Sequence, residues 1–347
     1  MNDERQATPI RRTVQAASNI SRVWGAVFAA LGLIVVLGAG AVFYVVQPLW
    51  PVTRAGPLVG TVDPAALEAH VRMLSDTLPP REWSRPENLE RAAEYVAAQL
   101  TRAGGRVAEQ PYTAFGTLQY RNVIASFGRE GGERIVVGAH YDTHAGLPGA
   151  DDNASGVAGL IELGRLLART TSARRGVDLV AFTLEEAPAY RSDAMGSWVH
   201  ARSLRNGGVR VRAMISLEMI GYFTDARGSQ QLPHPALGLV YPRTGDFIAV
   251  IGRLGEARLV RRVKRAMQRA TELPVYSMNA PTVVPGVDFS DHRSYWAHDY
   301  PAVMVTDTAF YRNPHYHTST DTSATLDYRR MAKVVEAVHG AVVALAR

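Results

Sequence analysis

The chain has 347 residues, of which 47% are hydrophobic and 20% are charged, the balance of a globular protein with a sizeable core. Its formal net charge of +6 does not indicate a nucleic-acid partner, because acidic residues are interleaved with the basic ones along the whole chain. The absence of cysteine excludes disulfides, thiolate zinc ligands and a cysteine nucleophile. Any metal must therefore be held by histidines and carboxylates.

An apolar segment near the N-terminus predicts a transmembrane helix. The stretch 23–46 contains no charged residue, and as a helix it would span roughly 36 Å, more than the hydrocarbon core of about 30 Å. Arginines precede it, and aromatic residues stand near its two ends, as interface anchors do: Arg11, Arg12, Arg22, Trp24, Tyr44 and Trp50. We predict a cytoplasmic segment over 1–22, a membrane anchor over 23–47 and an extracytoplasmic remainder.

The alternative for this segment is a signal peptide that is cleaved, which would make the protein secreted. Ala39-Gly40-Ala41 fits a small-residue cleavage site, although the apolar run continues beyond it to Val46. Both interpretations export the rest of the chain.

The remaining sequence predicts a linker over 48–62 and one domain over 63–347. Helical periodicity is found over 64–74, 88–103, 156–167, 256–270 and from about 328, and short apolar runs over 119–126, 134–139, 177–184, 211–217 and 302–305. This alternation predicts an α/β fold with a mostly parallel mixed sheet and helices on both faces. Residues 222–246 are predicted to be an irregular insertion after a strand.

Polar residues gather where the predicted strands end, which is where open α/β sheets bind ligands. Each of these segments carries His, Asp or Glu: His140 and Asp142, Glu185 and Glu186, Glu218, and the loop with Tyr316 and His317. Asp151 and Asp152 form a further acidic pair before a helix, and we expect Asp151 to be an N-cap. Carboxylates next to buried strands are costly unless they are compensated, so the pattern predicts a functional cluster.

Six segments in this order resemble the M28 zinc metallopeptidases, a family that includes secreted bacterial aminopeptidases. They are GAHYDTH, GADDNASGVAGLIELGRLL, FTLEEA, SLEMIGY, FSDHRSYW and YHTSTDT. The resemblance runs from about residue 65 to the C-terminus and is weakest over 222–285. It implies the zinc aminopeptidase (phosphorylase/hydrolase-like) fold, a peptide substrate and a site for two Zn²⁺ ions.

The resemblance also implies a role for each matching residue. His140 and Glu218 would bind the first zinc, Glu186 and His317 the second, and Asp152 would bridge the two. Glu185 would be the general base, Tyr316 a donor to the oxyanion, and Asp142 would orient the imidazole of His140. Asp291 and Asp321 match the family pattern as scaffold or pocket-shaping carboxylates. Asn153, Ser155 and Gly156 are expected to form the turn into the following helix.

Other functions remain open on the same fold. A carboxypeptidase would need a cation for the substrate's terminal carboxylate, for which Arg191, Arg243 and Arg312 are candidates. A glutaminyl-cyclase-like acyltransferase and a non-catalytic receptor-like ectodomain are disfavoured, because Glu185 and the full ligand set are present. No pattern indicates an oligomeric state. No function is assigned to the remaining histidines, which are His70, His144, His200, His234, His292, His298 and His339.

Overall fold

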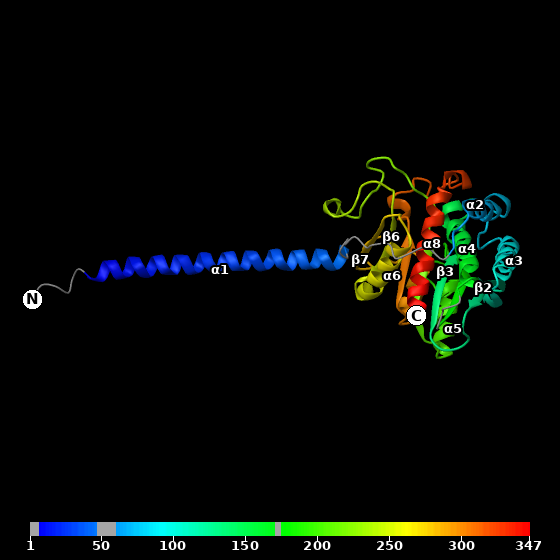
Figure 1. Cartoon of the computed structure of the whole chain (residues 1–347), viewed down its shortest axis with the longest axis horizontal. Coiled ribbons are helices and arrows are strands. Elements are labelled where there is room, and N and C mark those ends of the chain that lie inside the picture. The colour runs from blue at the N-terminus through cyan, green and yellow to red at the C-terminus, as the bar shows by residue number, and fades with distance from the viewer. Residues whose placement is uncertain (1–6, 47–59, 171–174) are drawn as a thin grey trace, which may run out of the picture. The chain divides into compact units, whose positions relative to one another are not determined.

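The computed structural model describes residues 7–46, 60–170 and 175–347, with side chains of the first segment described over 22–44. Helix α1 (Ala7–Val46) belongs to one unit, and the elements from α2 onward belong to a second. Each unit is described by itself (Figure 1). Residue 47 of the predicted anchor and residues 48–59 of the predicted linker lie outside the described residues.

Among the described residues, one helix is long and apolar enough to cross a membrane, over Arg22–Tyr44. Most of its large side chains, among them Phe28 and Val35, are more than half exposed. A signal sequence near an N-terminus has the same length and composition. Anchoring and orientation therefore remain predictions.

The second unit is built on a single eight-stranded mixed sheet with the strand order β1-β2-β4-β3-β5-β8-β6-β7. The strands are β1 (Arg106–Ala114), β2 (Leu118–Phe127), β3 (Arg134–His140), β4 (Gly176–Phe182), β5 (Val211–Glu218), β6 (Ile248–Arg253), β7 (Val275–Ala280) and β8 (Ala302–Thr306). The central strands β4, β3, β5 and β8 run parallel to one another, and β6 runs parallel to β7. The pairs β1–β2, β2–β4 and β6–β8 are antiparallel. This confirms the predicted mixed α/β sheet.

Helices cover both faces of the sheet because successive strand residues point to opposite sides. Ile135 and Val137 of β3 belong to the core that packs under α3 (Pro86–Arg102), α4 (Gly156–Ala168), α6 (Ala257–Ala270) and α8 (Tyr328–Ala346). Val136, between them, belongs to a separate core with residues of α5 (Gly196–Asn206) and α7 (His292–Ala297). Figure 1 shows α4 and α8 side by side along one face.

The other elements are shorter. Helix α2 (Pro64–Arg72) begins after Asp63, whose side chain accepts a hydrogen bond from the Ala65 amide, and continues into a π-helical turn over Met73–Thr77. The predicted irregular insertion over 222–246 is confirmed: it contains one 3₁₀ turn (Pro235–Leu239) and an isolated bridge between Arg227 and Thr244.

Candidate metal centre and substrate cavity

The central parallel strands deliver the polar residues to one edge of the sheet. His140 is the last residue of β3 and Glu218 the last residue of β5, while Glu185 and Glu186 follow β4 after two residues. All four are at least nine-tenths buried. The carboxyl ends of adjacent parallel strands lie together, so the fold itself brings these side chains into one cluster.

The first group of possible metal ligands consists of His140, Asp152 and Glu218. His140 Nε2 lies 3.3 Å from Asp152 Oδ1 and 3.5 Å from Glu218 Oε2. Ser290 Oγ donates a 2.7 Å hydrogen bond to the same Glu218 oxygen. This hydrogen bond fixes the carboxylate beside the imidazole.

A second group is formed around His317. Its Nε2 lies 3.1 Å from Asp152 Oδ2 and 3.3 Å from Glu186 Oε1. Asp152 therefore presents one oxygen to each histidine. This is the arrangement that a carboxylate bridging two cations requires, and the five residues expected as ligands lie together.

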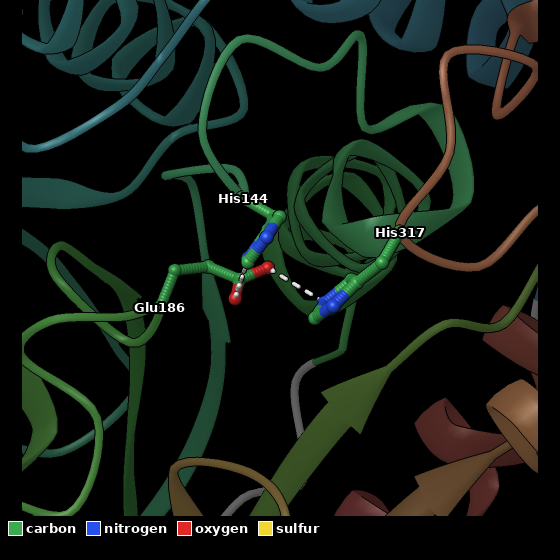
Figure 2. Close-up of side chains that lie close together, drawn as sticks. All are labelled: His144, Glu186 and His317. Carbon is green, nitrogen blue, oxygen red and sulfur yellow. Dashed lines mark ion pairs between the residues drawn. The ribbon is translucent and has the colours of Figure 1, made fainter.

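His144, to which the sequence assigned no function, also lies in the second group (Figure 2). Its Nδ1 is 3.5 Å from Glu186 Oε2. Its ring stacks on that of His317, with a centroid separation of 4.2 Å and an interplanar angle of 13°. Its sequence signal was its place at the end of the segment GAHYDTH, four residues after His140.

Asp142 holds the backbone that carries the two glutamates. Its Oδ1 and Oδ2 accept 3.0 Å hydrogen bonds from the amides of Glu185 and Glu186. The same carboxylate lies 3.3 Å from His140 Nδ1, on the side expected of a group that orients the imidazole. The buried Asp142 carboxylate therefore contacts a residue of each metal group, His140 and Glu186, and also the backbone of the candidate base Glu185.

The expected N-cap role of Asp151 is wrong. The structure finds no side-chain cap at the adjacent helical segments. Instead Asp151 Oδ1 accepts from the Gly221 amide and Oδ2 accepts from Asn313 Nδ2. The aspartate is completely buried, and it joins the loops after β5 and β8 to the segment that carries Asp152.

Asp321 and the predicted turn residue Asn153 both hold the segment around Asp152 by hydrogen bonds, as expected of a scaffold. Asp321 bonds the backbone directly. Its two oxygens accept hydrogen bonds from the amides of Asp151 and Asp152. Asn153 Oδ1 accepts from the Gly156 amide, and its Nδ2 donates to the Leu217 carbonyl. Asp152 is therefore held in place by hydrogen bonds to its own amide and to its chain neighbours Asp151 and Asn153.

The charges in the cluster are mutually dependent. Burial lowers the pKa of His140, but the surrounding carboxylates, first that of Glu218, outweigh this and raise the pKa well above its usual range. The pKa of His317 is raised to about 10, because hydrogen bonds to Asp152 and Glu186 outweigh its burial. Without a cation, the excess of carboxylates thus draws protons onto the imidazoles.

Glu185 is the glutamate that neither histidine contacts, and its carboxyl has a different environment. Burial raises its pKa well above the usual value, and the nearby charges of Glu186 and Glu218 add to this, against the effect of His140. A carboxyl with a raised pKa can take up a proton near neutral pH and return it, which suits a general base.

The donor set fits zinc. Nitrogen from histidine and oxygen from carboxylates are zinc ligands, and each group supplies three protein ligands with Asp152 shared, as catalytic sites do. The buried atoms that have no hydrogen-bond partner among the described residues include two from the expected ligands, His140 Nε2 and Glu186 Oε1. One belongs to each group and faces its other ligands, where a cation would satisfy it.

Tyr316 adjoins the second group. Its ring stacks on His317 with a centroid separation of 3.9 Å and an angle of 17°. Burial raises the pKa of the phenol further above its usual value, and the carboxylates, first that of Asp152, add to this. The hydroxyl therefore keeps its proton and remains a hydrogen-bond donor at neutral pH.

Arg81 is a site residue that sequence reasoning missed. Its guanidinium is completely buried, and it donates to the carbonyls of Tyr141, Leu74, Pro148 and Gly149. Burial lowers its pKa to about 10, against the attraction of Asp142, Asp321 and Asp152. It fastens the loop that leads into Asp152, and it lies outside the segments that the resemblance quotes.

Gly149 sits where this loop turns toward the metal groups, at a φ of 59°. A Cβ here would lie 2.3 Å from the Asp152 carbonyl oxygen and 2.3 Å from Thr143 Cγ2. Because the contact with the Asp152 carbonyl cannot be relieved without moving the backbone of Asp152, Gly149→Ala is expected to reduce the free energy of unfolding by about 2–4 kcal/mol, from the strained backbone and the overpacking together. Urea unfolding of the metal-free protein measures this.

Gly146 in the same loop provides the matched control. Its φ is 73°, but no atom lies within 4 Å of a built Cβ. Gly146→Ala should therefore cost only about 1 kcal/mol, the backbone term. Equal destabilisation by the two alanines would contradict the packing argument.

A mainly apolar cavity opens beside the metal groups, with Glu218 and Tyr316 in its wall. The strands β6, β7 and β8 contribute Ile251, Tyr276 and Met304, and the loops contribute Phe247, Phe289 and Phe310. Among the described residues that line it, none is Arg or Lys. An apolar side chain can enter, and a carboxylate would find no cation there.

Comparison with known proteins gives a family match. Residues 122–342, more than half of the chain, match the model described as peptidase family M28. The uncharacterized protein YfbL of Escherichia coli K12 is 49% identical over 283 residues, covering 79% of this chain and 86% of YfbL. Leucine aminopeptidase 1 of Arthroderma otae is 24% identical over 263 residues, covering 74% of this chain and 65% of that protein.

Solved structures show the same fold. A zinc aminopeptidase from Bacillus subtilis has a TM-score of 0.62 at 14% identity, over 81% of this chain and 94% of the other. A glutaminyl cyclase from Bacteroides thetaiotaomicron also has a TM-score of 0.62, at 19% identity, over 83% of this chain and 99% of the other. The fold alone therefore does not separate peptidases from cyclases.

Proposed function

Because the chain belongs to peptidase family M28 and is therefore a zinc metallopeptidase, we propose that it is a di-zinc aminopeptidase that releases apolar N-terminal residues from peptides. The observation that carries the proposal is Asp152, whose two oxygens lie between His140 and His317 and so divide the ligands into two groups. Zinc supplies a water of lowered pKa and polarises the scissile carbonyl.

The residues of the chain then have separate tasks. The Glu185 carboxylate accepts the proton of the attacking water and returns it to the leaving amine. The Tyr316 hydroxyl, which keeps its proton, donates a hydrogen bond to the oxyanion. The Asp142 carboxylate holds Glu185 and Glu186 in position by accepting hydrogen bonds from their backbone amides.

The direction of cleavage follows from charge. A free N-terminal amine is cationic, and the cluster beside which it would bind is rich in buried carboxylates. A carboxypeptidase needs a free cation, and the three arginines considered for it are engaged elsewhere. Arg191 pairs with Asp288, Arg312 is bonded to Gln230 and the Phe247 carbonyl, and Arg243 donates to the Pro235 carbonyl.

The wall of the cavity supports an apolar substrate side chain. Its aromatic and aliphatic lining would exclude water from a Leu, Met or Phe side chain, whereas a charged one would be buried without a partner. The complete pair of metal groups disfavours a cyclase-like role, and Glu185 disfavours a receptor without catalysis.

For the N-terminal segment we propose a membrane anchor, with the N-terminus in the cytoplasm and the peptidase domain over 63–347 outside. The apolar helix over Arg22–Tyr44 and the arginines before it support this. A shift in mass of the mature protein to that of a chain starting near residue 42 would instead establish cleavage and secretion.

The test of the function is hydrolysis by protein that is stripped of metal and then reloaded with zinc. We expect cleavage of leucyl, methionyl and phenylalanyl chromogenic amides, loss of cleavage on N-acetylation, and little cleavage of aspartyl or lysyl amides. Peptides that are N-acetylated or blocked at the C-terminus serve as comparators. Cleavage of peptides that survives N-acetylation but not C-terminal blocking would show a carboxypeptidase. No turnover by protein that carries two zinc ions would refute the peptidase proposal.

A further inference from the structure

His144 lies against the second metal group without being one of the expected ligands. Its Nδ1 is buried, has no hydrogen-bond partner among the described residues, and lies 3.5 Å from Glu186 Oε2. Figure 2 shows the Glu186 carboxylate beside the two stacked imidazoles, with its oxygens facing different histidines. Oε1 faces His317, and Oε2 faces His144.

The stacking geometry decides between two roles for His144. An imidazole coordinates a cation through a lone pair in the plane of its ring, at about 2.0–2.1 Å. The rings of His144 and His317 are nearly parallel and stacked, so their planes do not meet at a cation close to both nitrogens. His317 is the member of the pair whose Nε2 also faces Asp152, so it is the ligand and His144 is not.

We propose that His144 is a positioning residue for the second metal position. Its Nδ1–H holds Glu186 Oε2, which leaves Oε1 to the cation, and its ring supports the ring of His317. Tyr316 also stacks on His317, and two rings cannot occupy one face, so His317 is clamped between His144 and Tyr316. The inference rests on the two-metal site of the proposed function.

The carboxylate needs such a partner. Asp142 fixes the backbone amide of Glu186, but among the described residues the carboxylate oxygen Oε1 has no hydrogen-bond partner, and Oε2 is paired only with His144 Nδ1, at 3.5 Å. Without His144 the carboxylate is free to rotate away from His317. Loss of a group that orients a metal ligand typically weakens metal binding by about 10–100-fold.

Zinc binding to the full-length chain in detergent tests this. The metal-free protein is titrated with zinc against a competing chelator, and cobalt absorption spectra report the coordination at each position. We expect His144→Ala to weaken the second site by about 10–100-fold and to leave the first site unchanged, which also shows that the protein is folded.

Two further variants separate the hydrogen bond from the stacking. His144→Asn keeps a donor near Oε2 and should bind the second zinc nearly as tightly as the natural chain. His144→Phe keeps an aromatic ring without a donor and should be weakened like the alanine variant. His315→Ala is the control from the loop of His317, because its Nδ1 bonds Thr320 instead of a metal group.

Unchanged second-site affinity in His144→Ala would overturn the proposal, as would tight binding by the Phe variant with weak binding by the Asn variant. A cobalt spectrum that loses a nitrogen ligand in His144→Ala would make His144 a ligand and would also overturn it. If the natural chain binds only one zinc, the two-metal site itself fails. Binding of one zinc ion by the natural chain can be told apart from the other failure, in which the natural chain and His144→Ala both bind two zinc ions equally tightly.

Discussion

Replacing Glu185 by glutamine is expected to lower kcat about 10³-fold while both zinc ions stay bound, because general acid–base catalysis contributes about 10²–10⁴-fold. Glutamine has the shape of glutamate but cannot accept the proton of a water. Among the described residues, the ion pairs of His140, His144 and His317 go to carboxylates other than Glu185, so the ligand geometry is unaffected. The amide of residue 185 still donates to Asp142, which keeps Glu186 in place.

The measurement combines steady-state kinetics with zinc content by mass spectrometry. Glu256→Gln is the matched control: it is also a buried glutamate, it pairs with Arg253, and it lies outside the cluster. Its kinetics should equal those of the natural chain. Near-normal turnover by Glu185→Gln would show that another group takes the proton.

Replacing Asp152 by asparagine is expected to have the larger structural effect, the loss of at least one zinc ion per chain. The two carboxylate oxygens face His140 and His317 at 3.3 and 3.1 Å, and an amide has only one oxygen for the two positions. The loss of a catalytic cation removes several kcal/mol of transition-state stabilisation, so kcat/KM should fall by about 10³-fold or more at 1.36 kcal/mol per tenfold.

Zinc stoichiometry under buffered free zinc is the decisive measurement for this variant, with kcat/KM measured on the same sample. Asp76→Asn is a suitable control, since Asp76 accepts from Ser75 and Ser323 away from the metal groups. Asp152→Asn with two tightly bound zinc ions would show that Asp152 does not bridge them.

The sequence alone determined the class of fold, because its signals are local. The buried central strands β3 and β4 are short and mostly apolar, and the amphipathic helices show a period of 3.6. It missed β1, β6 and β7. Strand β1 lies at the edge with mostly exposed side chains, so it has no apolar run, and in β7 the apolar residues are interrupted by Ser277 and Asn279.

The sequence also indicated the residues at the strand ends and, through their resemblance to a family, a ligand set. The reason is topological: parallel strands bring their carboxyl ends to one edge whatever the loops do. Five expected ligands therefore lie together although they are spread from His140 to His317.

Only the tertiary structure decided which polar side chains hold the expected metal ligands in place. Those contacts depend on distances between loops, which the spacing of residues along the sequence does not encode. Asp151 was expected to cap a helix, but its oxygens bond Gly221 and Asn313 instead. Arg81 lies outside the quoted segments, and His144 ends the segment GAHYDTH without an assigned role, yet one fastens the loop into Asp152 and the other stacks on His317. A hydrogen bond between residues far apart in the chain is a product of packing, and packing is decided by the whole fold.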